Sequence, residues 1–118
     1  PVAPPEFITV QIGFAEERLP IADCAVIESR NKLVWVHTFS GESFRLSGTL
    51  EEWTGILEPA NFFRVNRQYL VAPKAIQSVE TTSTRKLKLN LVIPTDDVFV
   101  SKLNVTSFRQ WWNLGRPS

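Results

Sequence analysis

Hydrophobic and polar residues alternate over most of this chain with a period of two, which is typical of half-buried β-strands. Short polar turns separate the alternating stretches, for example Arg30-Asn31-Lys32 and Ser83-Thr84. The segment 69–75 contains Pro73 and is expected to be an irregular turn, because proline cannot donate to a strand ladder. The expected strands are 22–29, 33–38, 43–46, 63–67, 76–82, 86–92 and 98–101.

Two segments change to helical spacing. Thr49 and Glu52 form a Thr-x-x-Glu capping box, and Pro59 is expected to end the helix that follows. Its predicted apolar stripe is Leu50, Trp53, Ile56 and Leu57. Asn104 is expected to cap a final helix. The predicted buried side of that helix carries Val105, Phe108 and Trp112. These patterns predict a mostly β chain with two short helices.

The N-terminal part differs in composition from the rest. Residues 1–5 are proline-rich and read as the end of a linker, whereas 7–12 alternates and could be an extra strand or an ordered arm. Glu16, Glu17 and Arg18 are expected to form a polar turn. We therefore divide the chain into 1–17, a linker end with a possible extra strand, and 18–118, the main domain.

Composition narrows the class of protein. The 118 residues suit one domain, and a hydrophobic content of 43% argues against disorder. No apolar stretch approaches the roughly 20 residues that span a bilayer, so no membrane contact is expected. The single cysteine, Cys24, cannot form an internal disulfide, which favours a reducing cytoplasm.

Signatures of catalysis and of metal or cofactor binding are scarce. His37 is the only histidine and lies in a predicted strand, where a structural role is expected. Cys24 sits among apolar residues and is expected to be a small buried side chain. No histidine, cysteine or aspartate spacing suits a metal, and no glycine-rich loop opens a helix. The chain is therefore not expected to be an enzyme or to hold a cofactor.

The net charge of +1 hides an uneven distribution. Residues 1–60 hold four basic and nine acidic side chains, whereas residues 61–118 hold nine basic and three acidic ones. A basic surface would suit a polyanionic partner. Alternatively, the fold mixes the two halves in space and no basic surface forms.

The stretch 61–71 is the most informative part of the sequence. Phe63, Val65 and Tyr69 can face a core, while long hydrogen-bond donors lie between them. These donors are Arg64, Asn66, Arg67 and Gln68. Such side chains read base edges and grip phosphates, although a half-buried strand with a solvated face is an alternative. Arg64 could instead be structural, paired with an acid such as Glu80.

Four segments together resemble the LytTR DNA-binding domain, the effector module of many bacterial response regulators. The strongest are FFRVNRQYLVAPKAI at 62–76 and VFVSKLNVTSF at 98–108. IADCAVIESRNKLVWVHT at 21–38 and SGTLEEWTGIL at 47–57 fit the family's early strands and linking helix. The resemblance covers roughly 18–112 and implies an elongated set of small, mainly antiparallel β-sheets with two short helices.

The resemblance implies that loops between strands, rather than a recognition helix, enter the major groove of duplex DNA. The implied contact residues are Arg30, Asn31 and Lys32 in the first turn, Asn66, Arg67 and Gln68 in the second, and Lys102 and Asn104 after the last strand. Arg85 and Lys86 are added as candidate backbone contacts. Arg67 could pair with guanine or clamp a phosphate, Asn31 or Asn66 could pair with adenine, and Lys102 suits a phosphate.

Three departures from the family pattern bear on sequence specificity more than on binding itself. Lys102 stands where arginine is usual, Leu103 where some members carry a basic residue, and Ala72 where asparagine is frequent.

The resemblance also implies partners outside this segment. They are a receiver domain before Pro1, direct-repeat sites on double-stranded DNA, and a second copy paired on those sites. The alternative is a β-rich protein-interaction domain that binds an acidic partner. Trp111 and Trp112 are adjacent and are not expected to face inward together, so one of them would be an exposed anchor. An RNA-binding β domain is a third, weaker alternative, because no aromatic-rich sheet motif is present.

Overall fold

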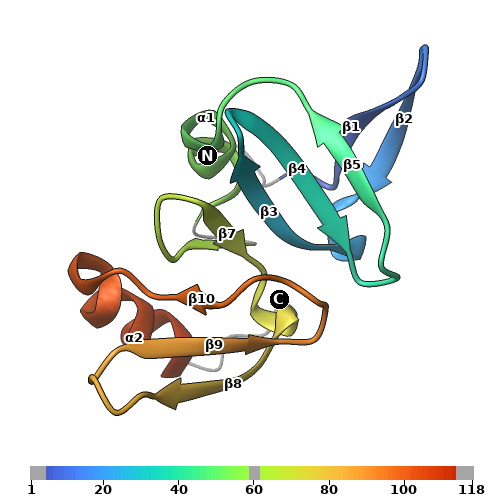
Figure 1. Cartoon of the computed structure of the whole chain (residues 1–118). Helices are drawn as coiled ribbons and strands as arrows, with labels where there is room; N and C mark the ends of the chain where they lie inside the picture. The colour runs from blue at the N-terminus through green and yellow to red at the C-terminus, as the bar shows by residue number, and fades with distance from the viewer. Residues whose placement is uncertain (1–4, 59–61, 114–118) are drawn as a thin grey trace.

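A computed structural model describes residues 5–58 and 62–113 of the chain. Two antiparallel sheets lie one beyond the other along an elongated molecule of 46 × 34 × 24 Å (Figure 1). Two α-helices accompany them, α1 (Leu50–Leu57) and α2 (Val105–Asn113). This confirms the mostly β, two-helix architecture that the resemblance implied. No helix among the described residues is long and apolar enough to cross a lipid bilayer.

The first sheet has seven strands in the order β2-β1-β5-β4-β3-β7-β6. Its strands are β1 (Phe7–Ile12), β2 (Ala15–Pro20), β3 (Cys24–Arg30), β4 (Leu33–Thr38), β5 (Ser43–Leu46), β6 (Phe63–Arg64) and β7 (Tyr69–Val71). The interior strand β3 is buried from Cys24 to Glu28, because β4 and β7 pair with it on either side.

The second sheet has three strands in the order β10-β9-β8, namely β8 (Ile76–Thr81), β9 (Leu87–Leu91) and β10 (Val98–Phe99). Within the part of the chain that the structure describes, three short 3-10 helices connect elements: η1 (Ile21–Asp23), η2 (Pro73–Ala75) and η3 (Lys102–Asn104). One buried apolar cluster runs through both sheets and includes Phe108 of α2, so the sheets share a single core.

The N-terminal segment forms a hairpin. The expected strand at 7–12 is confirmed as β1, but the polar turn expected at Glu16, Glu17 and Arg18 is wrong. Those residues belong to β2, so the division drawn between residues 17 and 18 falls inside a strand. They are polar because this edge strand is exposed on both faces except at Leu19. The turn lies between β1 and β2, where Gly13 adopts a left-handed φ of 61°. Residues 1–4 of the expected linker lie outside the described residues.

The segment 69–75 is not an irregular turn throughout. Tyr69–Val71 forms the buried strand β7 between β3 and β6. Pro73 begins η2 two residues after β7 ends, so it removes no hydrogen bond from that strand. The strand expected at 63–67 is correspondingly limited to Phe63–Arg64, because the chain turns at Asn66.

Helix α1 begins as the sequence predicts. The Thr49 hydroxyl accepts from Glu52 N at 3.2 Å, and Glu52 accepts from Thr49 N at 3.0 Å. Leu50 and Leu57 are buried, but Ile56 is 52% exposed, so its place in the predicted apolar stripe is wrong. The helix ends at Leu57, and Pro59, which was expected to end it, lies outside the described residues.

An aromatic cluster fastens α2 to β6. Phe108 is fully buried, and its ring lies 5.8 Å from Phe63, 5.9 Å from Trp111 and 6.3 Å from Trp112. Both tryptophans are partly buried against the core, so the expectation that one of them would be an exposed anchor is wrong.

Replacing Phe108 by alanine should destabilise the fold by about 3–5 kcal/mol, because it removes a buried ring from the cluster and leaves a cavity. Urea unfolding followed by circular dichroism measures this change. Leu103→Ala is the control: Leu103 is 95% exposed, so its loss should change stability by less than about 0.5 kcal/mol. A Phe108 variant as stable as the Leu103 variant would contradict the cluster's role.

Replacing Thr49 by alanine should cost about 1 kcal/mol of stability, because the first turn of α1 loses its hydroxyl acceptor. Thr49→Ser retains the hydroxyl and should stay within a few tenths of a kcal/mol of the wild type. Thermal unfolding of the two variants checks the prediction, and equal losses would argue against the cap.

Candidate nucleic-acid interface

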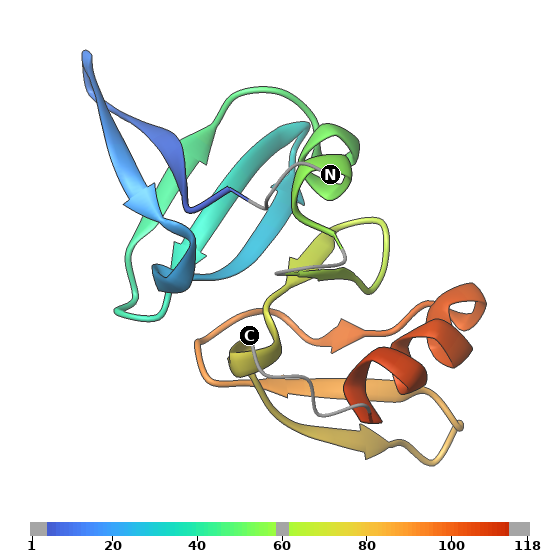
Figure 2. The ribbon, with the colours of Figure 1, turned by 180° about the vertical axis from the view of Figure 1, so that it is seen from behind.

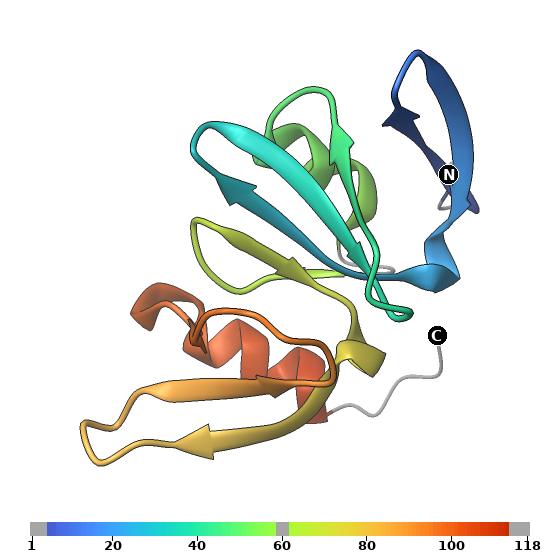
Figure 3. The ribbon, with the colours of Figure 1, turned by 45° about the vertical axis from the view of Figure 1, so that its right-hand side comes forward.

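Four turns from distant parts of the sequence line one edge of the molecule. They are the β3–β4 turn, the β6–β7 turn, the β8–β9 turn and η3, and they lie together on the left in Figures 1 and 3 and on the right in Figure 2. We call this side the loop edge and define it by residues 30–32, 66–68, 84–86 and 102–104. All ten residues that the sequence nominated for DNA contact lie on it.

Most of these side chains face solvent. The exposed ones are Arg30, Asn31, Lys32, Arg67, Gln68, Arg85, Lys86 and Lys102. Asn66 and Asn104 are only partly exposed. The ten nominated residues therefore divide into eight that are exposed for contact and two that are engaged in the fold.

The β3–β4 turn is a two-residue hairpin connection. Asn31 and Lys32 have φ values of 53° and 65°, and Arg30 pairs with Leu33 across the turn. Two consecutive left-handed residues are typical of a type I′ turn, in which asparagine is favoured. The side chains of this turn consequently project beyond the end of the sheet.

The amide of Asn66 holds the β6–β7 turn. Its Oδ1 accepts from Gln68 N at 2.8 Å and from Tyr69 N at 2.9 Å. Its Nδ2 donates to Phe99 O at 2.7 Å. This geometry supports a structural role for Asn66, and it leaves Arg67 and Gln68 as the outward side chains of the turn.

Of the two roles considered for Arg64, DNA contact and structural pairing with an acid, the structure supports the structural one. Its guanidinium donates to Asn66 O at 2.6 Å and to Arg67 O at 2.8 Å. Its acidic partner is Glu51 of α1, at 3.4 Å, rather than Glu80. The side chain is only 17% exposed. Arg64 thus fastens the β6–β7 turn to α1 from behind the loop edge.

The segment after β10 is tied to the same turn. Ser101 N donates to Val65 O at 2.8 Å. Asn104 Nδ2 lies 3.4 Å from Val65 O, so this side chain reaches back to the first sheet. The expected cap, a hydrogen bond between the Asn104 side chain and the first turn of α2, is not what the structure shows. Lys102 and Leu103 face outward, and Leu103, at 95% exposure, is an apolar side chain that the sequence analysis did not nominate.

The β8–β9 turn supplies two more cations. Arg85 has a left-handed φ of 65°, and its N–H donates to Thr82 O at 2.9 Å. The Lys86 ammonium lies 5.8 Å from the centre of the Phe99 ring. Both are exposed, so they extend the loop edge along the second sheet.

Cations from both halves of the sequence meet on this edge. Arg30 and Lys32 come from the acidic half, whereas Arg67, Arg85, Lys86 and Lys102 come from the basic half. The acidic strand β2 belongs to the hairpin on the opposite side of the molecule in all three views. Sequence halves are therefore not spatial halves, yet the cations still gather.

A buried acid behind the loop edge was missed by the sequence analysis. Glu28 is 3% exposed and bonds to Arg30, His37 and Tyr69. Its charge raises the pKa of Arg30, and burial followed by the Glu28 charge raises the pKa of Tyr69 to about 12. One glutamate within a strand gives little sequence signal, because two of its three partners, His37 and Tyr69, come from other strands.

The structure also accounts for the remaining candidate residues. The His37 ring lies between Glu28 and the Ser43 hydroxyl, 2.6 Å from the latter, in keeping with the structural role expected for it. Cys24 is buried, and burial together with the nearby Asp23 raises its pKa to about 12. No group of three or more potential metal ligands occurs within residues 5–58 and 62–113.

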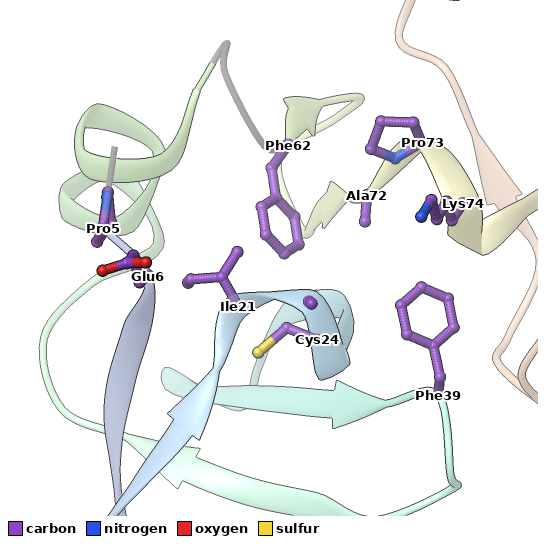
Figure 4. Close-up of a pocket in the computed structure, with 10 residues that line it drawn as sticks. Pro5, Glu6, Ile21, Cys24, Phe39, Phe62, Ala72, Pro73 and Lys74 are labelled. Atoms are coloured by element: carbon purple, nitrogen blue, oxygen red, sulfur yellow. The ribbon is translucent and has the colours of Figure 1, made fainter. Parts of the chain in front are cut away.

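A hollow of about 420 Å³ lies away from the loop edge, around η1, η2 and the β4–β5 turn (Figure 4). Phe39, Phe62 and Ile21 form much of its wall, with Lys74 near one end and Glu6 near the other. Among the described residues its lining is mainly apolar, and Lys74 alone does not make a row of cations that would suit a polyanion.

Comparisons with known proteins agree with this geometry. The model of the LytTr DNA-binding domain family matches residues 17–113. The transcriptional regulatory protein YpdB of Escherichia coli K12 is 30% identical over 95 residues, covering 80% of this chain, as is YpdB of Shigella flexneri. The chain spans 38% of the length of these relatives.

A solved LytTr DNA-binding domain from Bacillus cereus shares the fold. Its TM-score is 0.78 at 19% identity, and the match covers 95% of this chain and 99% of that one. The family match and the shared architecture together lead to one conclusion: the chain belongs to the LytTr DNA-binding domain family.

Proposed function

We propose that this chain is the duplex-DNA-binding output domain of a bacterial transcriptional response regulator, and that it reads the major groove through the loop edge. The observation that carries the proposal is the convergence of four turns, from residues 30–32 to 102–104, on one side of a LytTr-family fold. Loops on a rigid scaffold can follow a groove without inserting a helix.

The exposed side chains suggest a division of roles. Arg67 and Gln68 project from a turn whose backbone is fixed by Asn66 and Arg64, which suits contact with base edges. Lys102 is a flexible point charge and suits a phosphate. Arg85 and Lys86 extend along the second sheet as further backbone contacts. Asn31, in the first turn, keeps an exposed amide that suits adenine.

The proposal extends to the setting of the domain. We infer that residues 18–118 form the DNA-binding unit and that β1 adds an arm to its sheet. A receiver domain before Pro1, direct-repeat DNA sites, a homodimer formed on DNA and a cytoplasmic location complete the proposal. We assign the chain no catalytic role and no cofactor, in keeping with a family of DNA-binding domains rather than enzymes.

The alternative, an interaction domain for an acidic protein, is less well supported. It relied on an exposed tryptophan as an anchor, but Trp111 and Trp112 are both partly buried against Phe108. The family match also names DNA as the ligand.

Duplex binding should weaken steeply with salt, because phosphate contacts release counterions. If about five of the edge cations contact phosphates, the log–log slope of affinity against salt should be about −4 to −5. Fluorescence anisotropy of a labelled duplex, titrated with the 118-residue chain between roughly 50 and 300 mM KCl, measures the slope. A flat response would count against DNA binding through the loop edge.

Single replacements should separate the two kinds of contact. Arg67→Ala should cost about 1–3 kcal/mol on a duplex selected by the wild-type chain from a randomised library. Lys102→Ala should weaken binding to selected and random duplexes alike and reduce the magnitude of the salt slope by about 0.9. Anisotropy with both duplexes provides the measurement.

Lys74→Ala is the matched control, because it removes an exposed cation that lies beside the hollow of Figure 4 rather than on the loop edge. It should leave binding near the wild-type value. If a folded Arg67→Ala/Lys102→Ala double variant binds duplex as well as the wild type does, the acidic-partner alternative becomes the better explanation.

A further inference from the structure

The side chain behind the first turn of the loop edge is unusual for a DNA-binding surface, because it is a buried acid. Glu28 lies in β3, in register with Trp35 of β4 on one side and Tyr69 of β7 on the other. An ionised carboxylate with 3% exposure is costly unless it is fully paired and hydrogen-bonded. Glu28 is flanked by β4 and β7, the strands that follow the β3–β4 turn and the β6–β7 turn, and a buried acid at this position requires an explanation.

Both carboxylate oxygens of Glu28 are engaged, and the donors come from three strands. Oε1 accepts from His37 Nε2 at 2.7 Å and from Arg30 Nη2 at 3.3 Å. Oε2 accepts from Arg30 Nε at 3.0 Å and from Tyr69 Oη at 3.2 Å. The Arg30 contact is bidentate, which fixes the plane of the guanidinium as well as its position.

The contacts of Glu28 join two turns of the loop edge. Arg30 is the last residue of β3 before the β3–β4 turn, and Tyr69 is the first residue of β7 after the β6–β7 turn. A backbone hydrogen bond from Ser29 N to Gln68 O, at 2.8 Å, joins the residues next to Glu28 and Tyr69 in the sequence. Glu28 therefore contacts a residue at the base of each turn.

On the basis of the proposed DNA-binding function, we propose that Glu28 is a positioning residue that holds the Arg30 guanidinium in one direction for base recognition. An arginine has five N–H donors, and the contacts with Glu28 use two of them. Three donors remain for a base edge or a phosphate, and the Arg30 side chain is 51% exposed. A side chain ordered before binding loses less conformational freedom when it meets DNA.

The sign of the charge makes this inference testable. A carboxylate close to DNA repels phosphates, so removing its charge should leave sequence-independent binding unchanged or stronger. If Glu28 directs Arg30, the same change should weaken binding to a preferred sequence. A purely structural role would instead weaken binding to every duplex by a similar factor.

The test compares affinity for a duplex selected by the wild-type chain from a randomised library with affinity for a random duplex of equal length. For Glu28→Gln, we expect the ratio of the two affinities to fall by about tenfold or more, with random-duplex affinity equal to or above the wild-type value. Glu80→Gln is the matched control: it makes the same change at an exposed acid that contacts Asn90 rather than an arginine, and it should leave the ratio unchanged.

A second variant covers the case in which Glu28→Gln does not fold, as judged by circular dichroism. Arg30→Lys keeps the positive charge at an exposed position but cannot make the bidentate contact. It should lower the affinity ratio by about tenfold. In a double-mutant cycle, Glu28→Gln should add little further loss in the Arg30→Lys background.

The outcomes separate this inference from the proposed function. If the wild-type chain selects no sequence or binds no duplex, the DNA-binding proposal itself fails. If the wild type is selective and a folded Glu28→Gln or Arg30→Lys variant keeps a ratio within about twofold of it, only the positioning role is overturned.

Discussion

The two sheets are joined at Val65 and Asn66, and this junction fixes how the other elements are placed. Val65 is fully buried, and its carbonyl accepts from Ser101 N at 2.8 Å. The amide of Asn66 bonds to Phe99 O, 33 positions along the chain. Buried backbone groups must find partners, so the β6–β7 turn and the end of β10 fix each other. That mutual constraint brings the second turn and η3 onto one edge.

Charged side chains held behind the loop edge complete its support. Arg64 donates hydrogen bonds to two carbonyls of the β6–β7 turn and forms an ion pair with Glu51 of α1. Glu28 grips Arg30 at the end of β3. Each charge is largely removed from water and satisfied by several partners, which is the condition under which such a group is tolerated. The turns are thereby held by packed strands, and a site built on rigid elements is more precise than one on free loops.

Particular elements show where sequence reasoning succeeded and where it failed. The strands β4 and β5 and the cap at Thr49 follow from alternation and a local motif, and the structure has them. Strand β7 was mistaken for a turn because Pro73 is so near in sequence, although the ladder ends before it. Strand β2 was mistaken for a turn because an edge strand exposed on both faces has no apolar alternation to reveal it.

Features that depend on neighbours along the chain could be predicted from the order of residues alone: the period of most strands, the turn residues, the helix cap at Thr49 and, through the order of four segments, the family. The folded arrangement was needed to show which turns share an edge, that Arg64 pairs with Glu51 rather than Glu80, and that Glu28 also meets His37 and Tyr69. These contacts join residues on separate strands or helices. Their formation depends on which strands and helices are neighbours, and the alternation of polar and apolar residues along one strand does not specify the order of strands in a sheet.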